Sequence, residues 1–360
     1  MKIPPDNIVD GYNGKWVEIY YKIYRFASAK VVYLKSKTGK AWKEIMNCKL
    51  RLYMYRCSLI ILSFLMMAEL SAQKIEKVFL DKNDTTRNCY TIIYPDSLPW
   101  VGYLFLVPGF GETAEDVLLQ TKLPVETAKK GILTIIPTFQ DGVSSFGFDS
   151  LSQQAFHRIV DDVTNRYKLQ NSEYYLGGFS MGGSTVVKFA ETADKKPKAV
   201  FAIDSPLDFE RFYNSTKRDV VLFGKGGADQ ENIYLYLLSR IEQIMGGTPQ
   251  TALKNYHEIS PYSLSDTTQA AIKRLLNVPI RIYIEPDIQW WLDERETDVF
   301  GLNIIDCSAM VNELKRLGND RAALIVTQNK GYRKPDNNRH PHSWSIVDNR
   351  ELIEWLLQQK

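Results

Sequence analysis

Proline is scarce in this chain, with 15 residues in 360, while 44% of the residues are hydrophobic and 24% are charged. This composition excludes a disordered, collagen-like or polytopic membrane protein and favours a globular chain of one or two domains. Cysteine is rarer still, with four residues, and their spacing does not resemble a metal site. Cys89 and Cys307 are expected to be small, buried apolar residues that permit at most one disulfide, and whether they pair is left open.

A surplus of positive charge is missing from most of the chain. Residues 1–72 hold 12 Lys+Arg against 5 Asp+Glu, and the rest holds 33 basic against 37 acidic residues. The formal net charge of +3 therefore comes from the front of the chain. A nucleic-acid-binding function loses its main electrostatic support, and no nucleic-acid partner is expected.

A hydrophobic run long enough to span a bilayer is also lacking, since Leu59–Met67 is shorter than the roughly 18–20 residues needed. This run follows a basic stretch, Lys49–Arg56, and precedes Leu70–Ala72, which resembles a cleavage site before Gln73. Residues 46–72 are therefore predicted to be a secretory signal peptide. The prediction implies a secreted or periplasmic protein with no stable membrane insertion after cleavage.

The predicted signal peptide lies inside the chain rather than at its start. We therefore expect Met46 or Met54 to be the true start and residues 1–45 to be a non-native upstream extension. The mature chain would then cover residues 73–360, which is enough for one domain with a large core.

From Gln73 onward, short β-rich runs alternate with helical patterns, which is typical of a mostly parallel sheet covered by helices. The first two strands have no helix between them, so the sheet is expected to start antiparallel. The expected strands are Ile75–Leu80, Tyr90–Tyr94, Gly102–Val107, Ile132–Ile136, Tyr174–Leu176, Ala199–Ile203, Ile280–Ile284 and Ala323–Val326. The expected helices outside the longest connection are Asp149–Tyr167, Met181–Ala193, Asp306–Leu317 and Ser345–Gln358.

One connection, residues 206–277, is far longer than the usual 4–6 residues or so between elements of a compact domain. It contains helical patterns over Glu231–Ile244 and Thr267–Leu276. We interpret it as an inserted helical cap over the C-terminal edge of the sheet, where it would shape an active-site cleft.

The strongest chemical signal is a G-x-S-x-G motif formed by Gly178, Ser180 and Gly182, with a strand pattern before it and a helix pattern after it. A nucleophile on such a tight turn needs a strained backbone, and glycine two positions to either side removes the collisions. The helix that begins at Met181 directs N–H groups towards the serine, which favours an anion there. The pattern predicts a nucleophilic serine.

With this motif the chain resembles the α/β-hydrolase superfamily, from Leu104 to the C-terminus. The resemblance implies a mostly parallel sheet with helices on both faces. It also implies a serine, an acid after a later strand and a histidine near the end, in that order. The histidine would take the proton of the serine hydroxyl, and the carboxylate would hold the imidazole in the required tautomer.

Only four histidines are available for the role of base. His157 and His257 lie in a predicted helix and in the insertion, and are expected to be structural or surface residues. His342 is the predicted base because His-Ser-Trp before the final helix matches the family pattern. His340, two residues earlier, is expected to be a solvated loop residue.

The acid is less sharply defined, because several carboxylates follow the strand Ile280–Ile284. The resemblance favours Asp287, a few residues past that strand. Glu285 and Asp204, which ends the preceding strand, stay as alternatives. Asp293 and Glu294 are expected to be solvated charges.

The oxyanion hole requires two backbone donors. Met181 N–H supplies one by its place after the nucleophile, and the other is assigned to Phe110 in the loop Val107–Gly111, with Gly111 as the alternative. This loop has Pro108 where many relatives have histidine. A main-chain donor is unaffected by that side chain.

Aromatic residues are candidates for lining an apolar substrate pocket. They are Trp290, Trp291 and Trp344, together with Phe110, Phe146 and Phe148.

The sequence thus predicts a secreted serine hydrolase that cleaves a carboxylic ester or related acyl bond through an acyl-enzyme. It would act on a small ester or short peptide and would need no metal and no cofactor. A serine peptidase on the same fold and a catalytically silent binding protein are the alternatives.

Overall fold

The computed structural model describes residues 73–95, 99–223 and 228–359, and Gln73–Lys360 forms one compact unit. The predicted signal peptide, 46–72, and upstream extension, 1–45, lie outside the described residues. Within the described ranges, no helix is both long and apolar enough to cross a membrane.

An eight-stranded sheet runs through the unit in the order β1-β2-β4-β3-β5-β6-β7-β8. β1 pairs antiparallel with β2, and β2 pairs antiparallel with β4, whereas every later pair is parallel. This confirms the predicted antiparallel start and mostly parallel sheet. The strands are β1 (Ile75–Phe79), β2 (Cys89–Ile93), β3 (Gly102–Val107), β4 (Ile132–Thr138), β5 (Tyr174–Phe179), β6 (Ala199–Ile203), β7 (Ile280–Ile284) and β8 (Ala322–Val326).

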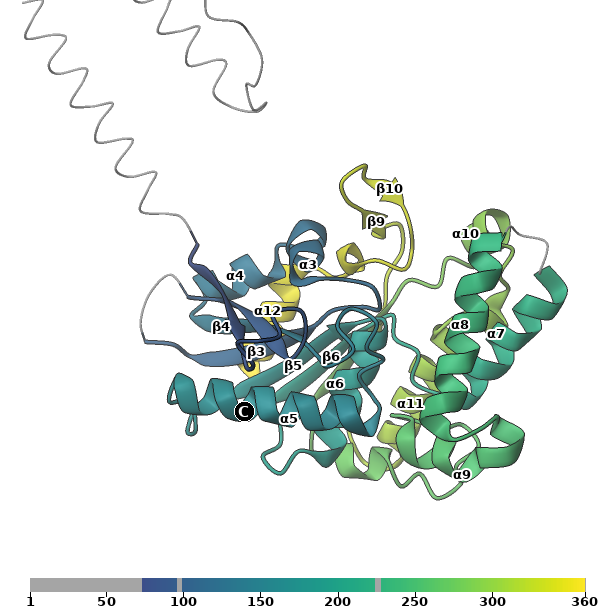
Figure 1. Ribbon diagram of the computed structural model, residues 1–360, viewed down its shortest axis with the longest axis horizontal. Helices are drawn as coiled ribbons and strands as arrows, with labels where there is room; N and C mark the ends of the chain where they lie inside the picture. Colours follow the sequence, from purple (N-terminus) through teal and green to yellow (C-terminus); the bar gives the residue numbers. More distant parts are fainter. Residues whose placement is uncertain (1–72, 96–98, 224–227, 360) are drawn as a thin grey trace, which may run out of the picture. The chain divides into compact units, whose positions relative to one another are not determined.

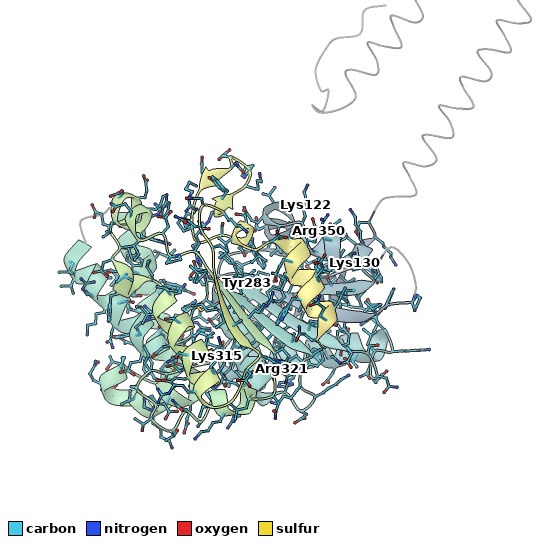
Figure 2. All side chains as sticks on the ribbon, turned by 180° about the vertical axis from the view of Figure 1, so that it is seen from behind. Lys122, Lys130, Tyr283, Lys315, Arg321 and Arg350 are labelled. Atoms are coloured by element: carbon cyan, nitrogen blue, oxygen red, sulfur yellow. The ribbon has the colours of Figure 1, made fainter. Side chains whose placement is uncertain are left out.

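Helices cover both faces of this sheet, as predicted (Figure 1). One face packs against α5 (Ser150–Arg166), α6 (Met181–Thr192) and α11 (Ile304–Arg316). The other face packs against α3 (Ala114–Gln120), α4 (Leu123–Lys129) and α12 (Asn349–Gln358). Figure 2 shows α12 in yellow on this second face, with Arg350 near its start and Tyr283 of β7 to one side of it.

The central strands are buried at every position, as β3, β5 and β6 show. Each large apolar side chain that is fully buried there contributes roughly 1.5–3 kcal/mol to folding. Cys89 and Cys307 are buried and are not joined by a disulfide, as expected of small core residues.

The predicted helices differ from the structure mainly at the C-terminus. Asp149 accepts a hydrogen bond from Ser152 N–H and starts α5 where predicted. The final helix, expected from Ser345, begins only at Asn349 because Trp344–Ile346 forms a separate 3₁₀ turn, η3. A small hairpin of β9 (Tyr332–Arg333) and β10 (Asn338–Arg339) precedes this turn and was not predicted.

The described residues of the insertion form three α-helices, α7 (Phe209–Phe223), α8 (Ala228–Met245) and α9 (Pro249–Ile259), shown in green at one end of the sheet in Figure 1. The helix predicted over 231–244 falls inside α8. The helix predicted over 267–276 is wrong, because only the short 3₁₀ turn η1 (Ile272–Leu275) forms there. The residues before η1 are held in a turn by Asp266, which accepts hydrogen bonds from Thr268 and Ala270 N–H.

A buried ion pair ties the insertion to the sheet's own helices. Arg211 of α7 donates to both carboxylate oxygens of Asp306 on α11, and the residues are 5% and 0% exposed. Asp306 also accepts from Leu207 and Asp208 N–H, so it fixes the start of α7. Between β7 and α11 lie α10 (Ile288–Arg295) and η2 (Val299–Gly301), which border the same end of the sheet.

Candidate active site

Ser180 occupies the sharp turn between β5 and α6 that its motif predicts. Its backbone has φ 52° and ψ −124°, a strained conformation for a residue with a side chain. A Cβ on Gly178 would lie 2.3 Å from backbone atoms of Gly182, and one on Gly182 would lie 2.3 Å from the carbonyl oxygens of Val107 and Pro108. Glycine is therefore required at both positions for the turn to close.

The neighbouring strand fixes this turn in place. β5 and β6 are parallel, with Phe179 opposite Ile203, and Ser180 N–H donates to Ile203 O at 2.8 Å. Met181 is the first residue of α6, so its N–H has no acceptor within the helix and stays available.

His342 follows the β9–β10 hairpin and reaches back to the turn. Its ring packs on Phe179 with centroids 4.5 Å apart, and Arg333 donates to its carbonyl oxygen at 2.8 and 3.1 Å. Its Nδ1 lies 2.9 Å from Oδ2 of Asp204. A proton on Nδ1 would bond to this carboxylate and leave Nε2 as the nitrogen that can accept a proton.

Asp204 directly follows β6 and is 4% exposed. Its N–H donates to Tyr283 O of β7 at 2.8 Å, and its φ of 45° turns the chain away from the sheet. Oδ1 accepts from the side-chain amide of Asn303 at 2.9 Å, which leaves Oδ2 for His342. The sequence did not point to Asn303, since an asparagine before a helix has no signature of this contact.

Asp287, the predicted carboxylate partner of His342, binds other groups instead. Its carboxylate accepts from Arg339 Nη2 and from Trp290 N–H, where it begins α10. Asp204 and Asp287 each follow a strand ending at the same edge of the sheet, so their sequence positions are equally compatible with a contact to His342. The structure corrects the prediction in favour of Asp204, the alternative on the earlier strand.

Glu285, the other alternative, is committed to structural contacts. It is 1% exposed, pairs with Arg339 at 2.6 Å and accepts from the N–H groups of Lys330 and Gly331. It thus holds the base of the loop that carries His342. Asp293 and Glu294 are exposed on α10, as expected.

The remaining histidines lie apart from this pair. His340 packs against Trp290 and Trp291, with centroids 4.9 and 5.7 Å away, and burial lowers its pKa to about 3. The expectation of a solvated side chain is therefore wrong for His340, because the two tryptophans of α10 cover it. His157 packs on a core phenylalanine, and His257 bonds to a serine in the insertion.

The loop after β3 has one free donor. Gly109 N–H donates to Glu112 Oε2 and Gly111 N–H donates to Val143 O, both at 2.8 Å. Phe110 N–H has no acceptor within the described residues. Gly111, the alternative oxyanion donor, is therefore engaged, whereas Phe110 borders the same cavity as Ser180 and Met181.

Glu112 is a site residue that the sequence analysis missed. Its carboxylate accepts from Gly109 N–H at 2.8 Å and from Trp344 Nε1 at 3.1 Å, and burial raises its pKa. It joins the loop after β3 to the segment that follows His342. No local motif marks it, because Trp344 lies 232 positions away in the chain.

Two cavities meet at Ser180 and His342. The insertion-side cavity, about 300 Å³, extends beneath α7 and α8 and is lined by Trp291 among others. The loop-side cavity, about 320 Å³, lies along the loop after β3 and is lined by Trp344. Of the other predicted pocket residues, Phe110 borders both cavities, Trp290 packs on Trp291, and Phe146 and Phe148 belong to the core beneath the insertion. Across the described part of the chain, no cluster of His, Cys, Asp and Glu could hold a metal ion.

No protein-family model matches the chain, and the comparison with curated proteins finds no match. Solved structures do match. MPT51 of Mycobacterium tuberculosis has a TM-score of 0.52 at 12% identity, and substrate-bound FphF of Staphylococcus aureus, a fluorophosphonate-binding serine hydrolase, has 0.50 at 13%. Each alignment covers 80% of this chain and 100% of the other.

An acylaminoacyl peptidase of Pyrococcus horikoshii is also similar, with a TM-score of 0.47 at 12% identity over 81% of this chain. The alignment spans only 41% of that longer protein. The sheet order, the serine turn and the two structures that match over their whole length agree: this chain has the α/β-hydrolase fold.

Proposed function

We propose that the chain is a serine hydrolase that cleaves an ester or related acyl bond through an acyl-enzyme. The observation that carries this proposal is the Asp204–His342 contact beside a serine held in a strained turn. The fold supports it, and so does the structural similarity to FphF, a fluorophosphonate-binding serine hydrolase.

In the first half of the reaction, Ser180 Oγ attacks the carbonyl carbon while His342 Nε2 takes the hydroxyl proton. Asp204 keeps the imidazole in the tautomer with Nδ1–H and stabilises the charged ring that forms. The N–H groups of Phe110 and Met181 are the proposed donors to the oxyanion. Collapse of the tetrahedral intermediate breaks the acyl bond, and His342 gives its proton to the leaving group.

In the second half, His342 removes a proton from water, which attacks the acyl-enzyme carbonyl. The second tetrahedral intermediate collapses, the acid leaves, and the proton returns to Ser180 Oγ. Ser180 and His342 take up and release the protons in both halves, and the chemistry requires no cofactor.

A fluorophosphonate probe tests the proposal on protein that begins at Gln73. We expect one labelled site, Ser180, and loss of labelling in Ser180→Ala and His342→Ala, with turnover of short-chain esters by the unmodified protein. Peptide amides assayed alongside distinguish a peptidase from an esterase. A folded protein that neither reacts with the probe nor turns over esters would overturn the proposal and favour a binding protein.

We also propose that the protein is exported, on the basic stretch, apolar run and Leu70–Ala72 sequence described above. N-terminal sequencing of the native protein is expected to read from Gln73. A native peptide from residues 1–45 would contradict both the cleavage and the proposed start.

A further inference from the structure

The insertion-side cavity is lined by acidic residues and by no Lys or Arg among the described residues. The carboxylates that line it are Asp204, Asp219 and Glu285, and the histidine that lines it is His342. A cavity with walls of one sign favours a ligand of the opposite sign.

Two of these carboxylates already have a partner. Asp204 faces His342 at 2.9 Å, and Glu285 pairs with Arg339 at 2.6 Å. Their charges are directed to the catalytic histidine and to the loop behind it, and they are not available to a ligand.

Asp219 of α7 is different, because none of the described residues forms a hydrogen bond or ion pair with its carboxylate. Its neighbour Arg218 instead pairs with Asp298 at 2.8 Å. Burial raises the pKa of Asp219 against the opposing effect of Arg218, as expected for a half-buried carboxylate without a bonded cation.

Aromatic side chains line the same cavity as Asp219. Phe110, Phe212 and Trp291 line it together with the carboxylate. Ring faces attract cations, and desolvation strengthens that attraction. A cavity lined by a free carboxylate and by aromatic rings suits an ammonium or guanidinium group and disfavours an anion.

We propose that the insertion-side cavity binds a positively charged group of the substrate, with Asp219 as its counter-ion. The substrate is then an ester or amide that carries an ammonium or guanidinium group. This inference rests on the proposed hydrolase function, since it places the cation beside the reacting serine.

Matched substrates that differ only in charge test the inference on both sides of the scissile bond. On the acyl side, the 4-nitrophenyl esters of 6-aminohexanoate and heptanoate form a pair. On the alcohol side, acetylcholine and 3,3-dimethylbutyl acetate form a second. We expect kcat/KM to favour the cationic member of at least one pair about tenfold, which corresponds to about 1.4 kcal/mol.

Asp219→Asn is expected to remove this preference while kcat/KM for the neutral esters stays within about twofold. The control, Asp293→Asn, changes an exposed carboxylate of α10 and is expected to keep the preference. Equal rates within both pairs in the unmodified protein, or a preference that persists in Asp219→Asn, would overturn the inference and leave the hydrolase proposal standing.

A binding measurement keeps the inference testable if catalysis is absent. Calorimetry with benzyltrimethylammonium is expected to show binding to Ser180→Ala and none to the Ser180→Ala, Asp219→Asn double variant. Failure of all esters and of the fluorophosphonate probe, with this binding intact, would refute the hydrolase and retain the cation site. No binding to Ser180→Ala would refute the cation site itself.

Discussion

Asp204 and Asp287 have the same side chain and similar positions after a strand, but their carboxylates have different partners. Asp204→Asn is expected to lower kcat/KM for esters by up to about 10⁴-fold, because the imidazole would take the wrong tautomer and its positive charge would lack support. Asp287→Asn, which weakens a contact to Arg339, is expected to lose less than about tenfold. Steady-state kinetics measures kcat/KM of the two variants, and circular dichroism checks that each is folded. A larger loss in Asp287→Asn than in Asp204→Asn would show that Asp287 is the acid.

Glu112 acts on the proposed oxyanion loop through Gly109 N–H rather than on the substrate. Glu112→Gln removes the charge and replaces one of the two acceptor oxygens with a donor, so Trp344 Nε1, which bonds to both oxygens, keeps at most one of its two acceptors. We expect kcat to fall and KM to change little. The fall in kcat should be smaller than the 10²–10³-fold or so that follows loss of an oxyanion donor. Glu115→Gln, on the exposed side of α3, is the matched control. A loss of thermal stability with an unchanged kcat would indicate a structural role alone.

For individual residues, the sequence was most informative where few residues of the required type are present. The G-x-S-x-G motif and the short supply of histidines singled out Ser180 and His342 as candidates, and both line the same cavity. The partner of His342 could not be read in the same way, because two carboxylates follow strands that end at one edge of the sheet. Glu112 was missed because its contact with Trp344 joins residues that are distant in sequence.

The Arg211–Asp306 pair connects α7 of the insertion to α11. Arg211→Met is expected to destabilise the fold by about 3–5 kcal/mol, because it leaves a buried carboxylate without its partner. The double variant Arg211→Met, Asp306→Leu is expected to recover much of that loss, since both charges are then removed. Urea denaturation of the three proteins measures the difference; a double variant less stable than Arg211→Met would show that the N–H bonds to Asp306 matter more than the pair.

Elements with a strong buried pattern were predictable, and those shaped by local side-chain bonds were not. β3, β6 and β7 have the predicted bounds, because strands covered on both faces form nearly continuous apolar runs. The region 267–276 has a helical pattern but forms a turn, since Asp266 binds the backbone and Gln269 adopts a positive φ of 54°. Within the insertion, α7 and α9 depend on packing against one another, which the sequence alone does not show.

For the molecule as a whole, a buried carboxylate makes stability depend on pH. The Glu191 side chain is 0% exposed, Oε2 accepts from Lys188 Nζ at 2.9 Å, and Oε1 has no partner. Burial raises the pKa of Glu191 to about 7, above its unfolded value of about 4.3. Protonated Glu191 therefore contributes its full stabilisation of the fold below about pH 4, and this contribution is lost as the pH rises through 7.

Glu191→Gln removes this titration while keeping an oxygen for Lys188. Its melting temperature is expected to vary less between pH 5 and 8 than that of the unmodified protein, which should fall as the pH rises. Glu354→Gln, exposed on α12, serves as the control and should follow the unmodified protein. Identical slopes for Glu191→Gln and the unmodified protein would exclude Glu191 as the source of the dependence.

The register of β5 and β6 has a consequence for how the chain can change over evolution. Ser180 and Asp204 each follow one member of the pair Phe179–Ile203, so their separation is set by the spacing of neighbouring strands, about 4.8 Å, and not by any loop. The insertion begins after Asp204 and lies outside the segment between the two. A change in the insertion, and with it in the proposed cation-binding cavity, therefore need not move Ser180 or Asp204.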